Sequence, residues 1–346
     1  MPKRLLTAAF ICCLGQPLAS ARADPVADFY KGRTVQVVIG TGTGGGYSVY
    51  ARLAVDHMAR HVPGGPTFVM QSMPGAGGKN MLNYAAKVAP KDGTFIFLIL
   101  QAAAVDQVMR APGVAYDVRE FGYVGRFTDN TAVSMGWVPA GVDSIEVVRQ
   151  RVVVTGGTGA TSPTDIIPKL LNRYAGTKYK LVTGYKGLPE IAFAMENGEV
   201  QAMVGSWVGF KTDFARLLND KKIMPLVQLA PKRHPELAAV PTAGELASTD
   251  MGRAVVGLAA SSADMGRAIA APPGVPADRL RALQTAFSRM LANEAFRAEA
   301  ARINADLNPA SGEALAAVAE ATLRTPQAAV REAAEVLGGD AVPNAK

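Results

Sequence analysis

Two glycine-rich segments constrain the fold of this chain more than any other feature, because each lies between a short apolar run and a helical pattern. The first, residues 40–46, follows an apolar run at 34–39 and precedes a helical pattern at 48–61. The second, residues 156–162, follows a similar run at 151–155. Strands that alternate with helices of this length form parallel sheets with right-handed crossovers. The two segments therefore predict an α/β fold.

The same order of strand, glycine-rich segment and helix occurs twice along the 346 residues. Further strands are expected at 67–71 and 95–100 in the first stretch, and at 179–183 and 200–205 in the second. A chain of this length is sufficient for two hydrophobic cores of ordinary size. We therefore predict two α/β lobes, each a mostly parallel sheet flanked by helices.

Glycine and proline interrupt the alternation of strands and helices near residues 123–138 and 252–268, where we expect the chain to cross between the lobes. Lobe 1 then comprises residues 24–126 and 262–346, and lobe 2 comprises residues 127–261. The tail of the chain is expected to be helical, and its last helix spans 311–337. A proline inside that helix, at position 326, predicts a kink there.

The first 23 residues have the layout of a secretory signal peptide. Lys3 and Arg4 precede an apolar run from Leu5 to Leu14, which is too short to span a membrane, and Ala21-Arg22-Ala23 supplies a cleavage pattern. Cleavage after Ala23 would remove both cysteines. It would also lower the formal net charge from +7 to +4, because three of the 36 Lys and Arg residues and none of the 29 acidic residues lie in this segment. We expect export to the periplasm.

Both glycine-rich segments are candidate anion sites. Ligands of open parallel sheets bind beyond the carboxyl ends of the strands, and each segment also begins a helix. Unpaired N–H groups at a helix N-terminus attract anions, and glycine allows a close approach. Two lobes that present such segments to each other form a cleft suited to a small carboxylate or phosphate. Hydroxyl donors near the segments are Thr43, Ser48, Thr158, Thr161 and Ser162.

The first segment also matches a dinucleotide-binding fingerprint, Gly40-x-Gly42-x-x-Gly45. The acidic residue that this motif needs at the end of the next strand is missing, because Gln71 and Ser72 stand there. An exported NAD(P)-dependent oxidoreductase is the alternative that the motif leaves open, and a thermal shift with NAD(P)H would distinguish it.

Other chemistry is poorly supported by the sequence. His57 and His61 share one helical face, which indicates packing histidines rather than a metal site, because no third ligand is near. Ser206 lacks the glycine of a nucleophile elbow. The basic pairs Lys221-Lys222 and Lys232-Arg233 are isolated and have no interleaved aromatic residues. We expect no catalytic residues, no metal, no cofactor and no nucleic-acid partner.

Several motifs occur in a recognisable order along the chain. The most specific is Met73-Pro74-Gly75-Ala76-Gly77-Gly78. Further motifs lie at 29–33, 50–53, 89–94, 185–187, 197–200, 240–242 and 271–276. Together they resemble the substrate-binding receptors of tripartite tricarboxylate transporters, the Bug family of periplasmic binding proteins, over nearly the whole mature chain.

The resemblance implies a two-lobed Venus-flytrap protein, expected as a monomer. Such a receptor captures a small di-, tri- or aromatic carboxylate in the periplasm and presents it to membrane transport subunits or a sensor kinase. The ligand's oxygens are held by backbone N–H groups, hydroxyls and waters, often without a salt bridge. This chain departs from the usual pattern at residues 44–48 and 162–165, which bear on the ligand pocket.

The glycine segments and the resemblance together give a set of candidate ligand-binding residues. The selectivity positions among them follow later strands, and an aromatic ligand is expected if Trp207 and Tyr47 face the cleft. The full set is Gly42, Thr43, Gly44, Gly45, Gly46, Tyr47, Ser48, Gly75, Ala76, Gln101, Thr158, Gly159, Ala160, Thr161, Ser162, Tyr185, Ser206 and Trp207.

Overall fold

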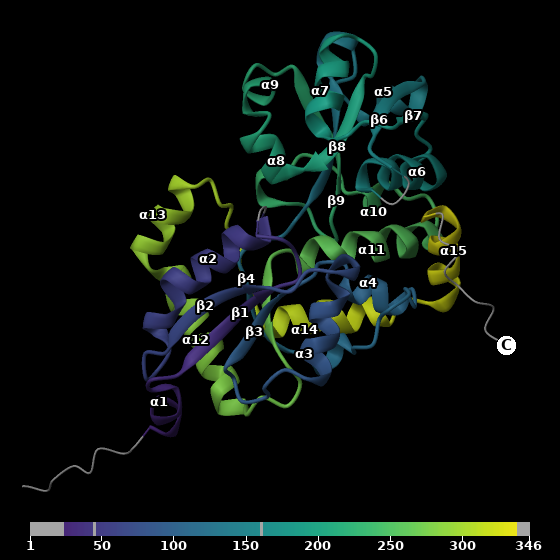
Figure 1. Cartoon of the computed structure of the whole chain (residues 1–346). Helices are drawn as coiled ribbons and strands as arrows, with labels where there is room; N and C mark the ends of the chain where they lie inside the picture. The colour runs from purple at the N-terminus through teal and green to yellow at the C-terminus, as the bar shows by residue number, and fades with distance from the viewer. Residues whose placement is uncertain (1–23, 44–45, 160–161, 338–346) are drawn as a thin grey trace, which may run out of the picture.

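The computed structural model describes residues 24–43, 46–159 and 162–337, and its two lobes lie one above the other in Figure 1. The predicted signal peptide at 1–23 lies outside the described residues. Within the ranges that the structure covers, no helix is long and apolar enough to cross a membrane.

A six-stranded mixed sheet forms the centre of the first lobe. Its strands are β1 (Thr34–Ile39), β2 (Thr67–Ser72), β3 (Phe95–Ile99), β4 (Gly122–Arg126), β10 (Ala268–Ala271) and β11 (Ala310–Ser311). They lie in the order β11-β4-β10-β3-β1-β2. β1 pairs in parallel with β2 and β3, as the sequence predicts, whereas β10 pairs antiparallel with β3 and β4.

A five-stranded mixed sheet forms the centre of the second lobe. Its strands are β5 (Ala132–Trp137), β6 (Val153–Gly157), β7 (Tyr179–Thr183), β8 (Ala202–Ser206) and β9 (Ile223–Leu229). They lie in the order β7-β6-β8-β5-β9. β6 is parallel to β7 and β8, and β5 is antiparallel to β8 and β9.

Helices flank both sheets (Figure 1). Those of the first lobe are α1 (Pro25–Tyr30), α2 (Gly46–Met58), α3 (Lys79–Lys87), α4 (Ala103–Val108), α12 (Ala277–Ala292), α13 (Glu294–Arg302) and α14 (Gly312–Leu323). Those of the second lobe are α5 (Ile145–Gln150), α6 (Pro163–Ala175), α7 (Leu188–Glu196), α8 (Trp207–Thr212), α9 (Ala215–Asn219) and α10 (Ala243–Leu246). The remaining two, α11 (Asp250–Met265) and α15 (Gln327–Leu337), lie where the lobes meet.

Apolar side chains cover both faces of each sheet. In the first lobe, Val37 and Ile39 belong to a buried cluster with α2 and α12, whereas their neighbour Val38 belongs to a second cluster with α3. All five residues of β3 are buried. A strand that is covered on both faces has this continuous apolar pattern, which is why the sequence reveals these strands so clearly.

Each sheet is mixed in part because it receives one strand from the direction of the other lobe; in the first lobe the short strand β11 also pairs antiparallel with β4. β5 follows β4 after residues 127–131, and β10 follows α11 after residues 266–267. Each of these strands starts at the junction between the lobes, where the parallel strands end, so it runs against them. The antiparallel pairs were not predicted from sequence, because pairing between distant strands is set by tertiary structure and not by local pattern.

The expected long C-terminal helix is two helices. α14 ends at Leu323 and α15 begins at Gln327, so Pro326 breaks the helix instead of kinking it. Proline lacks an N–H group and disfavours helical geometry at the residue before it. Ala329 and Val330 of α15 then pack into a core cluster that contains residues of α6 and α11. The division into lobes at 126/127 and 261/262 stays a prediction.

Candidate functional site

The two lobes are joined by crossing segments that pair with each other. The N–H group of Phe127 donates to the carbonyl of Arg267 at 2.9 Å, and the N–H group of Arg267 donates to the carbonyl of Thr128 at 2.8 Å. Gly266 precedes this pair with φ +49°, and a Cβ atom there would lie 2.2 Å from the carbonyl oxygen of Thr128. Only glycine fits such a position, so Gly266 fixes the direction of the backbone at Arg267.

A pocket of about 230 Å³ lies between the lobes, beside these crossing segments. α2 of the first lobe lies below α8 of the second at this place in Figure 1. Both lobes and the hinge supply polar atoms to its lining. The lining residues are Gly46, Tyr50, Thr128, Asp129, Asn130, Ser206, Val208, Gly209, Thr212 and Arg267.

Arg267 is the cation of this pocket. Its Nη1 atom donates to Oε1 of Gln101 at 2.9 Å, and Nδ2 of Asn130 donates to the same oxygen at 2.8 Å. The guanidinium carbon lies 4.3 Å from the centre of the Tyr47 ring, a cation–π contact. No Asp or Glu side chain among the described residues comes within 4.0 Å of the Arg267 nitrogens.

The first glycine segment begins α2 at the edge of the pocket. Gly42 and Thr43 are exposed, and Ser48 is buried with its hydroxyl donating to the carbonyl of Gly42 at 3.2 Å. Gly46 lines the pocket, whereas the candidates Gly44 and Gly45 lie outside the described residues. Of the neighbouring turn, Gly75 and Ala76 are both exposed.

The second glycine segment satisfies several of its donors internally. The N–H group of Gly159 donates to Oδ1 of Asp165 at 3.1 Å, and that of Thr158 donates to Oγ1 of Thr164 at 2.9 Å. The Thr158 hydroxyl donates to Oγ of Ser162 at 2.8 Å. Asp165 is buried in the first turn of α6, where its carboxylate offsets the positive end of the helix. The candidates Ala160 and Thr161 lie outside the described residues.

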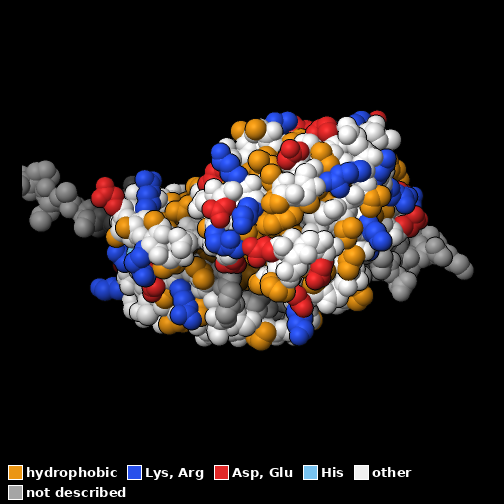
Figure 2. All heavy atoms as spheres, turned by 90° about the horizontal axis from the view of Figure 1, so that it is seen from above, with side chains coloured by type: hydrophobic (Ala, Val, Ile, Leu, Met, Phe, Trp, Pro, Cys, Tyr) orange, Lys and Arg blue, Asp and Glu red, His pale blue; other side chains and the backbone are white. Residues whose placement is uncertain are grey.

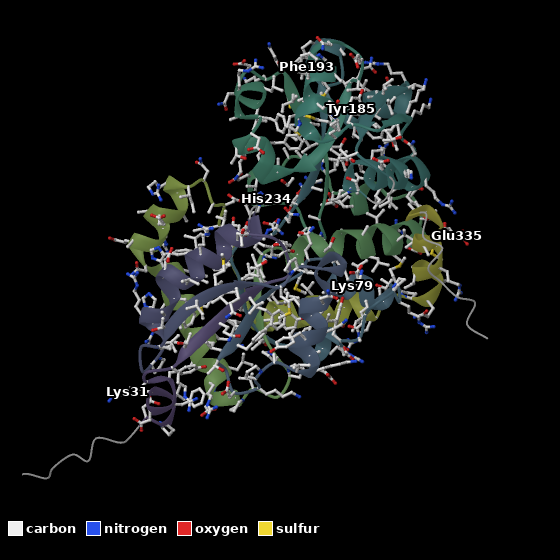
Figure 3. All side chains as sticks on the ribbon, viewed as in Figure 1. Lys31, Lys79, Tyr185, Phe193, His234 and Glu335 are labelled. Atoms are coloured by element: carbon white, nitrogen blue, oxygen red, sulfur yellow. The ribbon has the colours of Figure 1, made fainter. Side chains whose placement is uncertain are left out.

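The remaining candidates separate in space. Ser206 lines the interlobe pocket and caps α8, accepting from the N–H group of Gly209 at 3.1 Å. Trp207 does not line it: its Nε1 atom donates to Oε2 of Glu236 at 2.6 Å, and its ring lines a groove with Met224 and other residues of the second lobe. Tyr185 packs against a core cluster of the second lobe, and Figure 3 shows it in that lobe.

Sequence reasoning missed Arg267 and Asn130. Both lie in the stretches where the chain was expected to cross between lobes, but no glycine loop or motif marks them. The available signal was a basic residue directly after a glycine, Gly266-Arg267, inside a predicted crossing segment. Crossing segments form the floor of an interlobe cleft, so a charged residue in such a segment is a candidate ligand-binding residue.

The dinucleotide fingerprint has a structural explanation. A Cβ atom on Gly40 would lie 3.1 Å from Cα of Gly78, so this glycine lets the loop after β1 pack against the turn before α3. Ser72, at the place of the expected acidic residue, donates its hydroxyl to the carbonyl of Thr41 at 2.6 Å. His57 is buried, and its ring packs edge-on against Phe296 with centroids 5.6 Å apart.

The charged side chains on the face shown in Figure 2 are interspersed, with basic and acidic groups side by side.

His234 lies near the junction of the lobes in Figure 3, with its Nε2 atom 3.7 Å from Oδ1 of Asp129. Asp129 also accepts from Nδ2 of Asn308 at 2.9 Å and from the hydroxyl of Thr131. Its carboxylate is therefore part of the hinge network.

Comparison with solved structures gives the class of fold. A TctC solute-binding protein from Polaromonas is 17% identical with a TM-score of 0.68, and the match covers 88% of this chain and 99% of that one. The protein MatC from Rhodopseudomonas palustris with bound malate is 22% identical with a TM-score of 0.55, covering 88% and 99%. The R. palustris protein Rpa4515 with adipate is 22% identical with a TM-score of 0.57, covering 88% and 97%.

These similarities define the fold as that of the two-lobed periplasmic solute-binding proteins, which confirms the predicted fold class. No protein-family model matches the sequence, and no curated protein matches it.

Proposed function

We propose that this chain is a periplasmic receptor that closes its two lobes on a small organic carboxylate. The observation that carries the proposal is the interlobe pocket at the hinge, to which α2, α8 and both crossing segments contribute. A ligand in this pocket touches both lobes only when they are close, so binding favours the closed state through differential contact. The receptor then presents its ligand to transport subunits of the tripartite tricarboxylate type, or to a sensor.

The composition of the pocket supports a carboxylate ligand. Its one basic side chain, Arg267, has no acidic partner within 4.0 Å in the described part of the chain. Its one acidic side chain, Asp129, is engaged by Asn308 and Thr131. Hydrogen bonds between charged groups are stronger than neutral ones. Its volume of about 230 Å³ is below the roughly 300–1,000 Å³ of sites for drug-sized ligands. MatC holds malate and Rpa4515 holds adipate in their own structures, and both ligands are small carboxylates.

The proposal assigns binding rather than catalysis, and it places the mature chain in the periplasm after removal of residues 1–23. Thr43, Gly46, Tyr47, Ser48 and Gln101 are proposed to hold or position the ligand from the first lobe. The second lobe contributes Ser206, and the remaining candidates of the two glycine segments complete the two loops.

The test is a thermal-unfolding screen of the chain from residue 24 onward. The panel contains acetate, malate, adipate, citrate and benzoate, with adipamide as an uncharged control and NADH for the alternative reading. A ligand at 100 times its Kd stabilises the native state by about 2.7 kcal/mol, so at least one carboxylate should raise the melting temperature and adipamide should not. A shift with NADH and none with any carboxylate would overturn the proposal in favour of the oxidoreductase.

A further inference from the structure

We propose that Arg267 anchors the ligand by a bidentate ion pair, so that the group recognised at the hinge is an ionised carboxylate with both oxygens on one guanidinium edge. This inference rests on the proposed function, which requires a carboxylate in the pocket but does not say what holds it. It replaces the expectation of recognition without a salt bridge, because the pocket contains a cation that the glycine loops do not supply.

The contacts of Arg267 leave one edge of its guanidinium open. Nη1 donates a hydrogen bond to Oε1 of Gln101, and one face of the guanidinium plane lies over the ring of Tyr47. The Nε and Nη2 atoms have no hydrogen-bond acceptor among the described residues, and they form the edge whose two N–H groups point in parallel. A carboxylate matches that edge with two parallel hydrogen bonds.

Gly46 keeps this same edge accessible. A Cβ atom at position 46 would lie 3.2 Å from Nε and 3.5 Å from Nη2 of Arg267. Any side chain there would crowd the two atoms that the ion pair needs. Gly46 is also the first residue of α2, a helix of 13 residues, whose positive end adds to the attraction for an anion at this point.

The guanidinium is held in place before a ligand arrives. Arginine can only donate hydrogen bonds, so Gln101 must present its oxygen, and Asn130 donates to that oxygen from the other side. Tyr47 accepts from the N–H group of Gln101 at 3.0 Å and supports the guanidinium with its ring. Such preorganisation lowers the entropy lost on binding.

The second glycine segment does not offer an equivalent site. Its Thr158 and Gly159 N–H groups are already engaged by Thr164 and Asp165, and the carboxylate of Asp165 opposes an anion there. We therefore assign recognition of the ligand's negative charge to the first lobe and the hinge. The second lobe closes over the ligand with neutral groups such as the Ser206 hydroxyl.

The test measures Kd by calorimetry for the carboxylate that stabilises the wild-type chain most in the panel, and for the matching primary amide. Arg267→Gln should weaken the carboxylate about 100-fold and Arg267→Lys about 10-fold, because each hydrogen bond between charged groups contributes severalfold or more. Gly46→Ala keeps the charge of Arg267 but crowds its open guanidinium edge, so it should weaken carboxylate binding about 10-fold or more. The amide should show no measurable binding to wild type or to any variant.

Matched controls make the same substitutions elsewhere. Gly257→Ala adds a Cβ atom with nothing within 4 Å, and Arg281→Gln removes an exposed charge on α12; both should bind within about twofold of wild type. If wild type binds a carboxylate but Arg267→Gln and Gly46→Ala bind it equally well, the anchor is wrong and the proposed function stands. If Arg267→Gln weakens binding and Gly46→Ala does not, the assigned edge is wrong. If no carboxylate binds wild type, both proposals fail. Should Arg267→Gln not fold, Arg267→Lys and Gly46→Ala decide the question.

Discussion

The Nζ atom of Lys211 lies 2.9 Å from Oδ1 of Asp306 and joins the two lobes on the side of α8. Lys211 belongs to α8 of the second lobe, whereas Asp306 follows α13 of the first. Glu236 holds the same ammonium group at 2.8 Å, and Trp207 donates to Glu236 in turn. This chain of contacts, here called the interlobe latch, explains why Trp207 has a structural partner instead of facing the pocket.

Removing the charge of Lys211 should favour the open form. Its side chain is 26% exposed and that of Asp306 is 17% exposed, so the pair should contribute near the upper end of the roughly 0.2–1 kcal/mol found for exposed pairs. Lys211→Met is then expected to raise the ratio of open to closed molecules by up to about fivefold. Small-angle scattering or interlobe energy transfer would report this as a larger mean separation. Lys87→Met, an exposed lysine on α3, serves as the control, and equal behaviour of the two variants would contradict the latch.

Acid should weaken the contacts of Glu236 with Lys211 and Trp207, which all lie within the second lobe. Burial opposes ionisation of Glu236, but hydrogen bonds from Lys211 and Trp207 outweigh it and hold the pKa of Glu236 below its ordinary 4.5. The stabilisation from this carboxylate is thus present above pH 4.5 and is lost as the pH falls through the lowered value. Burial also opposes the charge of Lys211, yet hydrogen bonds to Glu236 and Asp306 raise the pKa of Lys211 above 10.5, so it stays charged throughout.

We therefore expect the free energy of unfolding to fall between pH 5 and pH 3 in wild type and to fall less in Glu236→Gln. Urea denaturation at each pH would measure both. An identical acid response in the two proteins would show that another group is responsible.

Gly266 and Gly257 should respond in opposite ways to the same methyl group. Gly266 has φ +49°, and a Cβ atom would meet the Thr128 carbonyl oxygen at 2.2 Å, so Gly266→Ala should lower the free energy of unfolding by about 3 kcal/mol or more. Gly257 lies inside α11 with open space around it, and Gly257→Ala should raise that free energy by about 0.5–1 kcal/mol. Urea denaturation measures both. Equal effects would mean that the hinge tolerates another backbone geometry.

Asp165 provides a test of how the second glycine segment acts. Its buried carboxylate accepts from the N–H group of Gly159 and the hydroxyl of Thr164, each at 3.1 Å. Asp165→Asn should lower the free energy of unfolding by about 1–2 kcal/mol, since hydrogen bonds to a charged group are lost. Carboxylate affinity should stay constant or rise, because a negative charge is removed. A tenfold loss of affinity in a folded variant would show that the ligand depends on this loop more directly.

The sequence predicted those strands and helices whose hydrophobic pattern is local. β1 and β7 have the predicted bounds. Each ends where a glycine follows within the next residue, although β7 is an edge strand and is largely exposed. The strands β5 and β10 were not predicted, because their position depends on partners more than 60 residues away in the chain. Pro326 was recognised as an interruption, but only the packing of α15 against α11 shows that it separates two helices.

The sequence by itself determined the α/β class, the two glycine-rich loops at strand ends and the doubled order of elements, since these follow from hydrophobic periodicity and from the conformational freedom of glycine. The tertiary structure alone decided which polar groups meet. It places Arg267 beside Gly46, which lies more than 200 positions away in the chain. Arg267 directly precedes β10, a strand that no local sequence pattern predicts. It also turns Trp207 toward Glu236 and occupies the second loop with Asp165. Pockets are built from distant segments, so their charge depends on chain crossings that periodicity does not encode.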